Sequence, residues 1–161
     1  MRTVLSVLQF LESTLATLAY VGVGGMLIAD VLGRELFGVS ILGLQKLAIY
    51  AAIVAGFVGL SLATAANVHL RPEVFDRLVP PHYDGLANRI SDGFAALFFA
   101  GLGVIAIRFV MQSADVGDKA AIFYFVLWPI QIVMPYAFFS CAFRHLAFAL
   151  RPDLKPRGEA K

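Results

Sequence analysis

The feature that most constrains this chain is a run of twenty residues, Leu47–Ala66, that carries no charged side chain. A helix rises ~1.5 Å per residue, so twenty residues span ~30 Å, the thickness of the hydrocarbon core of a bilayer. The run is therefore predicted to cross a membrane. Across the whole chain, 60% of the residues are hydrophobic and 15% are charged, a composition that excludes an ordinary soluble domain.

The segment that follows, residues 67–80, has a different pattern. Its apolar residues recur at helical spacing, while charged residues fill the other side. The apolar positions are Leu70, Val74, Phe75 and Leu78, and the charged positions are Arg71, Glu73, Asp76 and Arg77. This pattern predicts a short amphipathic helix that lies on the membrane surface. A membrane-lying connector without a specific partner fits the same pattern.

Three further apolar stretches predict additional spans. The first, Leu15–Ala29, is interpreted as retained rather than as a cleaved signal peptide, because Glu12 precedes it and a hydrophobic protein follows. The others are Gly93–Ile107 and Ala120–Phe143. With their flanking residues, we expect four helices at about residues 10–36, 45–66, 86–111 and 120–143.

Charged residues beside these stretches carry further expectations. Asp30 and Arg34 lie four residues apart and are expected to pair near a membrane interface. Asp92 and Arg108 flank the third stretch, where each charge suits the helix macrodipole. Aromatic residues near helix ends are interpreted as interface anchors or packing residues. They are Tyr124, Trp128 and Tyr136.

These elements predict an all-α integral membrane protein with four transmembrane helices and a short amphipathic interfacial helix. A single membrane domain is expected over residues 1–150, with a basic tail at 151–161. The fourth helix is expected to kink or unwind at Pro129 and Pro135. Nine lysines and arginines fall on the side of the two termini and four on the other. The positive-inside rule then places both termini and the amphipathic segment in the cytoplasm.

The positions of the chemically active residues argue against several functions. No predicted span has a charge at its centre, which argues against a proton pump, an ion-coupled carrier or a metalloprotease built from this chain alone. His69, His82 and His145 are expected at interfaces or in water, so no haem site is predicted. The one cysteine, Cys141, excludes an internal disulfide. A net charge of +2 does not indicate nucleic acid. We expect no catalytic, cofactor-binding or metal-binding residue.

Two stretches together resemble a known family. One is Asp30–Ser40, which closes the first span with an arginine and a phenylalanine. The other is the second span, which contains Gly56 and Gly59 and runs into Asn67–Glu73 with its histidine. With the chain length, the four spans and the basic tail, they resemble the DctQ-like small membrane subunit of tripartite ATP-independent periplasmic (TRAP) transporters. That family often has acidic residues entering the second span, where this chain has Gln45 and Lys46.

The resemblance implies a specific role. In such transporters a periplasmic substrate-binding protein delivers an organic acid, usually a carboxylate, to a large membrane subunit that moves it inward with a sodium gradient. The small subunit packs beside the large one in the bacterial inner membrane as a scaffold, and helps to dock the binding protein. The coupling sodium is then expected in the large subunit, and this chain is not expected to be an enzyme.

Within that role, three sets of residues are candidates for partner contacts. The periplasmic candidates are Arg34, Glu35, Asp115, Asp118 and Lys119. The candidates for the large-subunit interface are Gly22, Gly25, Gly56 and Gly59, because small residues allow helices to approach closely. The candidates on the cytoplasmic interfacial helix are His69, Arg71, Phe75 and Leu78. An alternative function is the membrane anchor of a respiratory enzyme complex, and a third is a self-associating four-span protein without a transport partner.

Overall fold

The computed structural model describes residues 2–40, 42–66, 84–120 and 122–154. Within this part of the chain the regular structure is helical and no β-strand forms. The elements are α1 (Arg2–Phe37), α2 (Leu44–Ala65), α4 (Asp84–Val116), α5 (Trp128–Gln131), α6 (Val133–Leu150) and the 3-10 turn η2 (Pro152–Leu154). Within the described residues, four helices, counting α5 and α6 as one, are long and apolar enough to cross a membrane. The prediction of an all-α, four-span membrane protein is confirmed, while the predicted amphipathic segment 67–80 lies outside the described residues.

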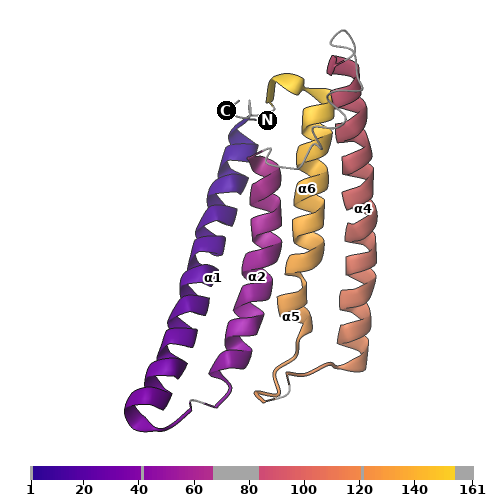
Figure 1. Ribbon diagram of the computed structural model, residues 1–161. Coiled ribbons are helices and arrows are strands. Elements are labelled where there is room, and N and C mark those ends of the chain that lie inside the picture. Colours follow the sequence, from indigo (N-terminus) through magenta and orange to yellow (C-terminus); the bar gives the residue numbers. More distant parts are fainter. Residues whose placement is uncertain (1, 41, 67–83, 121, 155–161) are drawn as a thin grey trace.

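The four spans lie side by side in the order α1, α2, α6, α4 (Figure 1). In this row α1 packs against α2, α2 against α6, and α6 against α4. The start of α1 and the end of α6 lie at the same end of the helices, at the top of Figure 1. The chain thus forms two helical hairpins, α1–α2 and α4–α6, which meet where α2 packs on α6.

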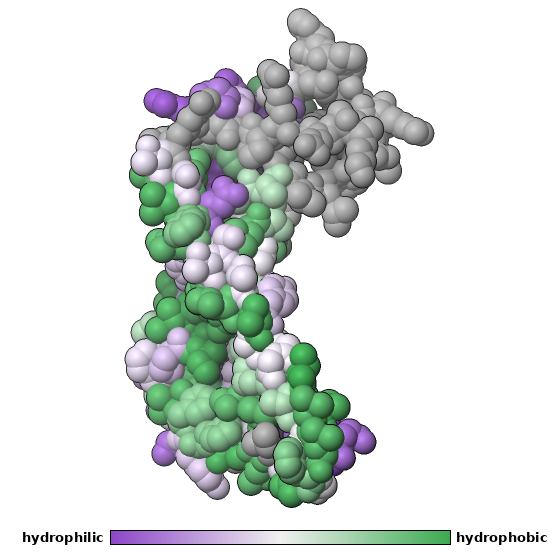
Figure 2. Space-filling model, turned by 90° about the vertical axis from the view of Figure 1, so that its left-hand side faces the viewer, coloured by the Kyte–Doolittle hydropathy of each residue, from purple (hydrophilic) through white to green (hydrophobic). Residues whose placement is uncertain are grey.

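A row of helices buries little of its own apolar surface. Only 11% of the most apolar window of α1 and 22% of that of α4 are buried inside the chain. Figure 2 shows the α1 side of the molecule, where apolar residues cover most of the surface and hydrophilic residues gather near its two ends. Such a surface requires lipid or another membrane protein as its neighbour.

The length of α2 provides a scale for depth in the membrane. Its 22 residues correspond to ~33 Å of helix, close to the ~30 Å of the hydrocarbon core. The 36 residues of α1 and the 33 residues of α4 exceed this thickness. These two helices therefore extend beyond the hydrocarbon core.

The third span is longer than its uncharged run. α4 extends eight residues beyond Asp92 on one side and eight beyond Arg108 on the other. Neither charge therefore lies at a helix end, and the macrodipole interpretation of these two residues is wrong. The helix continues because Leu86 and Ile90 on one side, and Met111 on the other, maintain the apolar register past each charge.

The fourth span begins and ends later than residues 120–143. The residues just before Trp128 are not helical, and Lys119 forms an isolated antiparallel bridge with Val126. Among these residues Phe125 packs edge to face on Tyr50 of α2, with the ring centroids 5.5 Å apart. At its other end the helix continues through the charged residue Arg144 to Leu150.

The expected local unwinding of the fourth span is confirmed for Pro135, between α5 and α6, whereas Pro129 lies in the first turn of α5 and interrupts no helix. The helix is interrupted at Ile132. Pro135, in the first turn of α6, has no N–H to donate to the carbonyl of Gln131 four residues earlier. The missing hydrogen bond explains why the interruption falls here.

Candidate functional site

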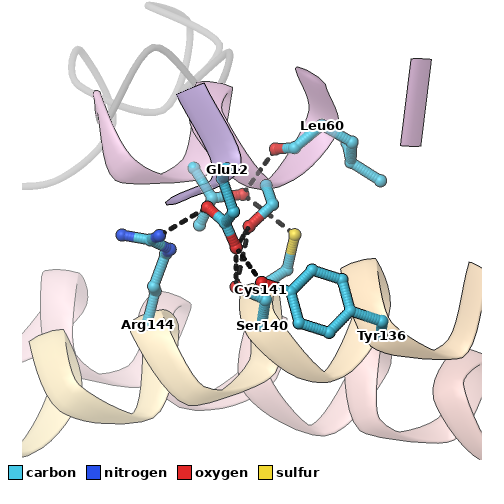
Figure 3. Close-up of polar contacts among 8 residues, drawn as sticks. Glu12, Leu60, Tyr136, Ser140, Cys141 and Arg144 are labelled. Atoms are coloured by element: carbon cyan, nitrogen blue, oxygen red, sulfur yellow. Dashed lines mark hydrogen bonds and ion pairs between the residues drawn. The ribbon is translucent and has the colours of Figure 1, made fainter. Parts of the chain in front are cut away.

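Glu12 is the centre of a buried polar cluster, the Glu12 cluster, which joins three helices. Glu12 is 1% exposed. Arg144 of α6 donates through Nη2 to Glu12 Oε2 at 2.6 Å. The hydroxyl groups of Ser61, Ser140 and Tyr136 donate to Oε1 at 2.7, 2.7 and 3.2 Å. Figure 3 shows Tyr136, Ser140 and Arg144 pointing from α6 toward the carboxylate.

The spacing of the α6 residues explains why they converge. Tyr136, Ser140 and Arg144 follow one another at intervals of four, which places them on one face of a helix. Ser61 enters from α2, and its Oγ also lies 2.7 Å from Ser140 Oγ. The Glu12 cluster therefore connects the α1–α2 hairpin to the α4–α6 hairpin.

The Glu12 cluster lies at hydrocarbon depth. Ser61 is four residues, or ~6 Å, before the end of α2, the helix whose length matches the core. A lone charge in mid-span costs roughly 2.5 to 3.5 kcal/mol on insertion scales, whereas here a carboxylate and a guanidinium neutralise each other. The Glu12–Arg144 pair lies nearer one end of α2 than its middle, so it does not contradict the expectation that no predicted span has a charge at its centre, but a buried pair here was not expected. Hydropathy does not reveal it, since each residue lies just outside an uncharged run.

A second buried pair lies on the other side of α6. His145 Nδ1 lies 3.2 Å from Asp92 Oδ1 of α4. The imidazole stacks on Phe99 with ring centroids 5.7 Å apart, and His145 is 6% exposed. His145 is buried rather than solvated, because α6 continues past Phe143 and turns this residue toward α4, and its expected place near a membrane interface stays a prediction. His69 and His82 lie outside the described residues.

At the opposite end of the helices from the Glu12 cluster, Asp30 organises the turn between α1 and α2. The predicted pair with Arg34 is confirmed at 3.0 Å. Asp30 is 1% exposed and also accepts hydrogen bonds from Ser40 Oγ at 3.1 Å and from Gln45 Nε2 at 2.8 Å. An amide at position 45 therefore serves as a donor to a buried carboxylate, which gives the departure at Gln45 a physical reason.

Replacing Gln45 with glutamate tests that reason. The variant Gln45→Glu removes a donor and sets a second carboxylate against Asp30, so we expect a loss of about 1–3 kcal/mol of stability. The measurement is unfolding of the purified chain in detergent at neutral pH. Lys46→Gln, at the exposed neighbouring position, is the matched control and is expected to stay within about 0.5 kcal/mol of wild type. Equal stability of the two variants would contradict the role assigned to Gln45.

The predicted periplasmic candidates lie at the end of the helices opposite the start of α1, which is the lower end in Figure 1. Arg34 and Glu35 are exposed in the last turns of α1. Asp115, near the end of α4, and Asp118 and Lys119, in the loop that follows, are exposed as well. The fold therefore places all five on the same end, and their contacts with a partner remain a prediction.

The predicted glycine candidates lie in α1 and α2 and are mostly open. A Cβ added at Gly25 or Gly56 would meet no atom within 4 Å. At Gly22 it would lie 3.8 Å from Met26, and at Gly59 it would lie 3.8 Å from the hydroxyl of Tyr20. These glycines are therefore not required for packing inside the chain. The candidates His69, Arg71, Phe75 and Leu78 lie outside the described residues.

Sequence reasoning did not identify the residues that hold the hairpins together. Tyr136 was expected as an anchor or packing residue, yet its hydroxyl contacts Glu12. The signal that identifies this site is the spacing of polar residues every four positions in an apolar helix. Elsewhere in the span, Cys141 is buried, and Thr64 Oγ1 lies 3.2 Å from its Sγ. The described residues contain no group of three or more potential metal ligands.

Comparison with known families agrees with this architecture. The family model described as "Tripartite ATP-independent periplasmic transporters, DctQ component" matches residues 23–154. The match runs from the middle of α1 to η2 and includes Arg144, while Glu12 precedes it. No curated protein and no solved structure matches the chain. Since the matched region covers most of the sequence and the four spans are present, this multi-pass membrane chain belongs to the DctQ family, the small membrane component of tripartite ATP-independent periplasmic transporters.

Proposed function

We propose that this chain is a non-catalytic scaffold subunit of a sodium-gradient-driven transporter for an organic acid such as a carboxylate. It packs against the large membrane transport subunit, which holds the coupling sodium, and helps to dock the periplasmic substrate-binding protein. The observation that carries the proposal is the open row of helices, which buries only 11% of the most apolar window of α1. A row of this kind offers a long apolar flank to a larger membrane neighbour.

The closed polar clusters support a static role. The Glu12 carboxylate is surrounded by one guanidinium and three hydroxyl groups, and Asp92 contacts His145. These contacts tie neighbouring helices together. A transporter in which one part slides requires another part that stays fixed. Two hairpins that are joined by buried polar contacts and carry a broad lipid-facing surface would provide the fixed part.

The proposed orientation is that of the inner membrane with both termini in the cytoplasm. The distribution of lysines and arginines favours this orientation, and the start of α1 and the end of α6 lie at the same end of the helices (Figure 1). The end that carries Arg34, Glu35, Asp115, Asp118 and Lys119 then faces the periplasm. Exposed charges there would steer a soluble binding protein toward the complex.

Co-purification tests the proposal directly. An affinity-tagged copy of this chain, expressed with a large membrane transport subunit, is expected to retain that subunit through detergent extraction and washing. A tagged, unrelated four-span protein serves as the control. Loss of the large subunit under conditions in which both proteins remain folded would contradict the scaffold role. The rival function, a respiratory membrane anchor, is not favoured by the family match, and a haem band in the visible spectrum would revive it.

The open glycine of α2 provides a second prediction. Gly56→Leu adds a side chain where this chain has no neighbour, so we expect unchanged folding of the isolated chain. If α2 contacts the large subunit closely, the added side chain should weaken the assembly about tenfold by overpacking the interface. The comparison variant is Gly85→Leu, at an equally open position at the start of α4. Unchanged co-purification of the Gly56→Leu chain would count against this face.

A further inference from the structure

Arg108 is a charged residue of α4 for which the described part of the chain supplies no partner. It is exposed, and it makes no hydrogen bond or ion pair with the other described residues. By contrast, the charged residues Glu12, Asp92 and Arg144 inside the described helices are buried and paired. Arg108 differs from them in both respects.

The contacts between helices place Arg108 at hydrocarbon depth. A Cβ added at Gly103 would lie 2.9 Å from the ring of Phe139, and the next residue of α6, Ser140, contacts Ser61 of α2 at 2.7 Å. Arg108 lies five residues, or ~7.5 Å, further along α4 than Gly103. This position is roughly level with the middle of α2, far from both ends of the helix that spans the core.

The depth of Arg108 separates a lipid partner from a protein partner. A position level with the middle of α2 is far from the headgroups on both sides, so an arginine there would have to snorkel over a long distance to reach a phospholipid phosphate. A partner at the same depth fits this position better.

Arg144 shows how such an arginine is satisfied in this chain. It also lies in the C-terminal half of its helix, and it pairs at depth with the carboxylate of Glu12 from another helix. On this reasoning, which rests on the proposed function, we propose that Arg108 pairs with an acidic side chain on a membrane helix of the large transport subunit. The outward face of α4 around Arg108 is then part of the interface between the two membrane subunits.

The neighbours of Arg108 define what the partner must present. Gly101 lies seven residues earlier on the same face, and an added Cβ there would meet nothing within 4 Å. Between them Val104 and Ile105 are 49% and 64% exposed. A complementary partner is an apolar helix that approaches closely at Gly101 and carries one carboxylate two turns away. A single pair of opposite charges at this depth would fix how the two helices align along their axes as well as how tightly they bind.

The test compares Arg108→Gln with Arg89→Gln, an exposed arginine nearer the other end of the same helix. Each variant is co-expressed with the large transport subunit, and the amount of large subunit retained on the tagged chain is measured. We expect Arg108→Gln to retain about tenfold less than wild type, Arg108→Lys to retain an intermediate amount, and Arg89→Gln to match wild type. The melting temperature of the isolated Arg108→Gln chain should not fall, because no partner among the described residues is lost.

The outcomes distinguish this pairing from the proposed function. If the wild-type chain does not retain the large subunit, the proposed function fails and the pairing fails with it. If wild type and Arg108→Gln retain it equally, the pairing alone is overturned. A photo-crosslinking amino acid at position 105 is expected to react with the large subunit. Crosslinking there only to phospholipid, with fewer phospholipids bound to Arg108→Gln by native mass spectrometry, would assign Arg108 to a lipid phosphate and overturn the proposal.

Discussion

Glu12→Ala is expected to lower the stability of this chain by about 3–5 kcal/mol, the usual cost of removing one partner of a buried ion pair. The substitution leaves the guanidinium of Arg144, which is 2% exposed, without its carboxylate at hydrocarbon depth. It also removes the acceptor that Ser61, Ser140 and Tyr136 share. The measurement is denaturant unfolding of the purified chain in detergent micelles.

A double-mutant cycle separates the ion pair from general damage. Glu12→Ala and Arg144→Met are each expected to be strongly destabilising, whereas the chain with both changes should be more stable than the sum of the single effects predicts, with a coupling energy of at least about 2 kcal/mol. Glu35→Ala removes an exposed carboxylate from the same helix and serves as the control, with an expected effect within about 0.5 kcal/mol. Additive effects in the cycle, or a Glu12→Ala chain as stable as Glu35→Ala, would show that the pair does not link the hairpins.

Gly43→Ala is expected to lower the stability of this chain by about 2–5 kcal/mol, the second largest effect. Gly43 has a φ of 88°, and a residue with a Cβ atom in this left-handed region lowers the stability of the fold by ~1–2 kcal/mol. Its added Cβ would also lie 2.5 Å from the ring of Phe123, and overpacking of this kind adds ~1–3 kcal/mol. The contact matters because it joins the α1–α2 turn to the loop before α5, at the end opposite the Glu12 cluster.

Gly38→Ala isolates the two contributions at Gly43. Gly38 also has a positive φ, 66°, but an added Cβ there would meet nothing within 4 Å. We therefore expect Gly38→Ala to show only the backbone cost, and the excess destabilisation of Gly43→Ala to report the collision with Phe123. Thermal unfolding of both variants in the same detergent gives this comparison. Equal melting temperatures would mean that the two loops do not depend on a close approach at Gly43.

The four spans were predictable because they depend on local composition. Each contains a long uncharged run, and a helix is the structure that satisfies every backbone polar group in lipid. The ends of the spans were less predictable. The residues just before Trp128 are apolar but not helical, and among them Phe125 packs on Tyr50 of α2. Past the last uncharged run, the helix continues because Arg144 is neutralised by a residue 132 positions away.

The Glu12 cluster was not predictable from charge and hydropathy, because its energy comes from contacts between distant segments. Glu12 and Arg144 each interrupt an apolar pattern, and only the fold shows that they do so at the same depth. The spacing of Tyr136, Ser140 and Arg144 was visible in the sequence, and it identifies a polar face without identifying its partner. The Asp30–Arg34 pair was predictable because both residues lie on one helix, four positions apart.

Reconstitution of transport tests the scaffold role most directly. Liposomes that contain this chain alone, the large subunit alone or both are supplied with an organic acid, its periplasmic binding protein and an inward sodium gradient, and uptake is measured. We predict no uptake with this chain alone and full uptake only when both membrane subunits are present. Sodium-driven uptake by this chain in the absence of the large subunit would contradict the proposed function.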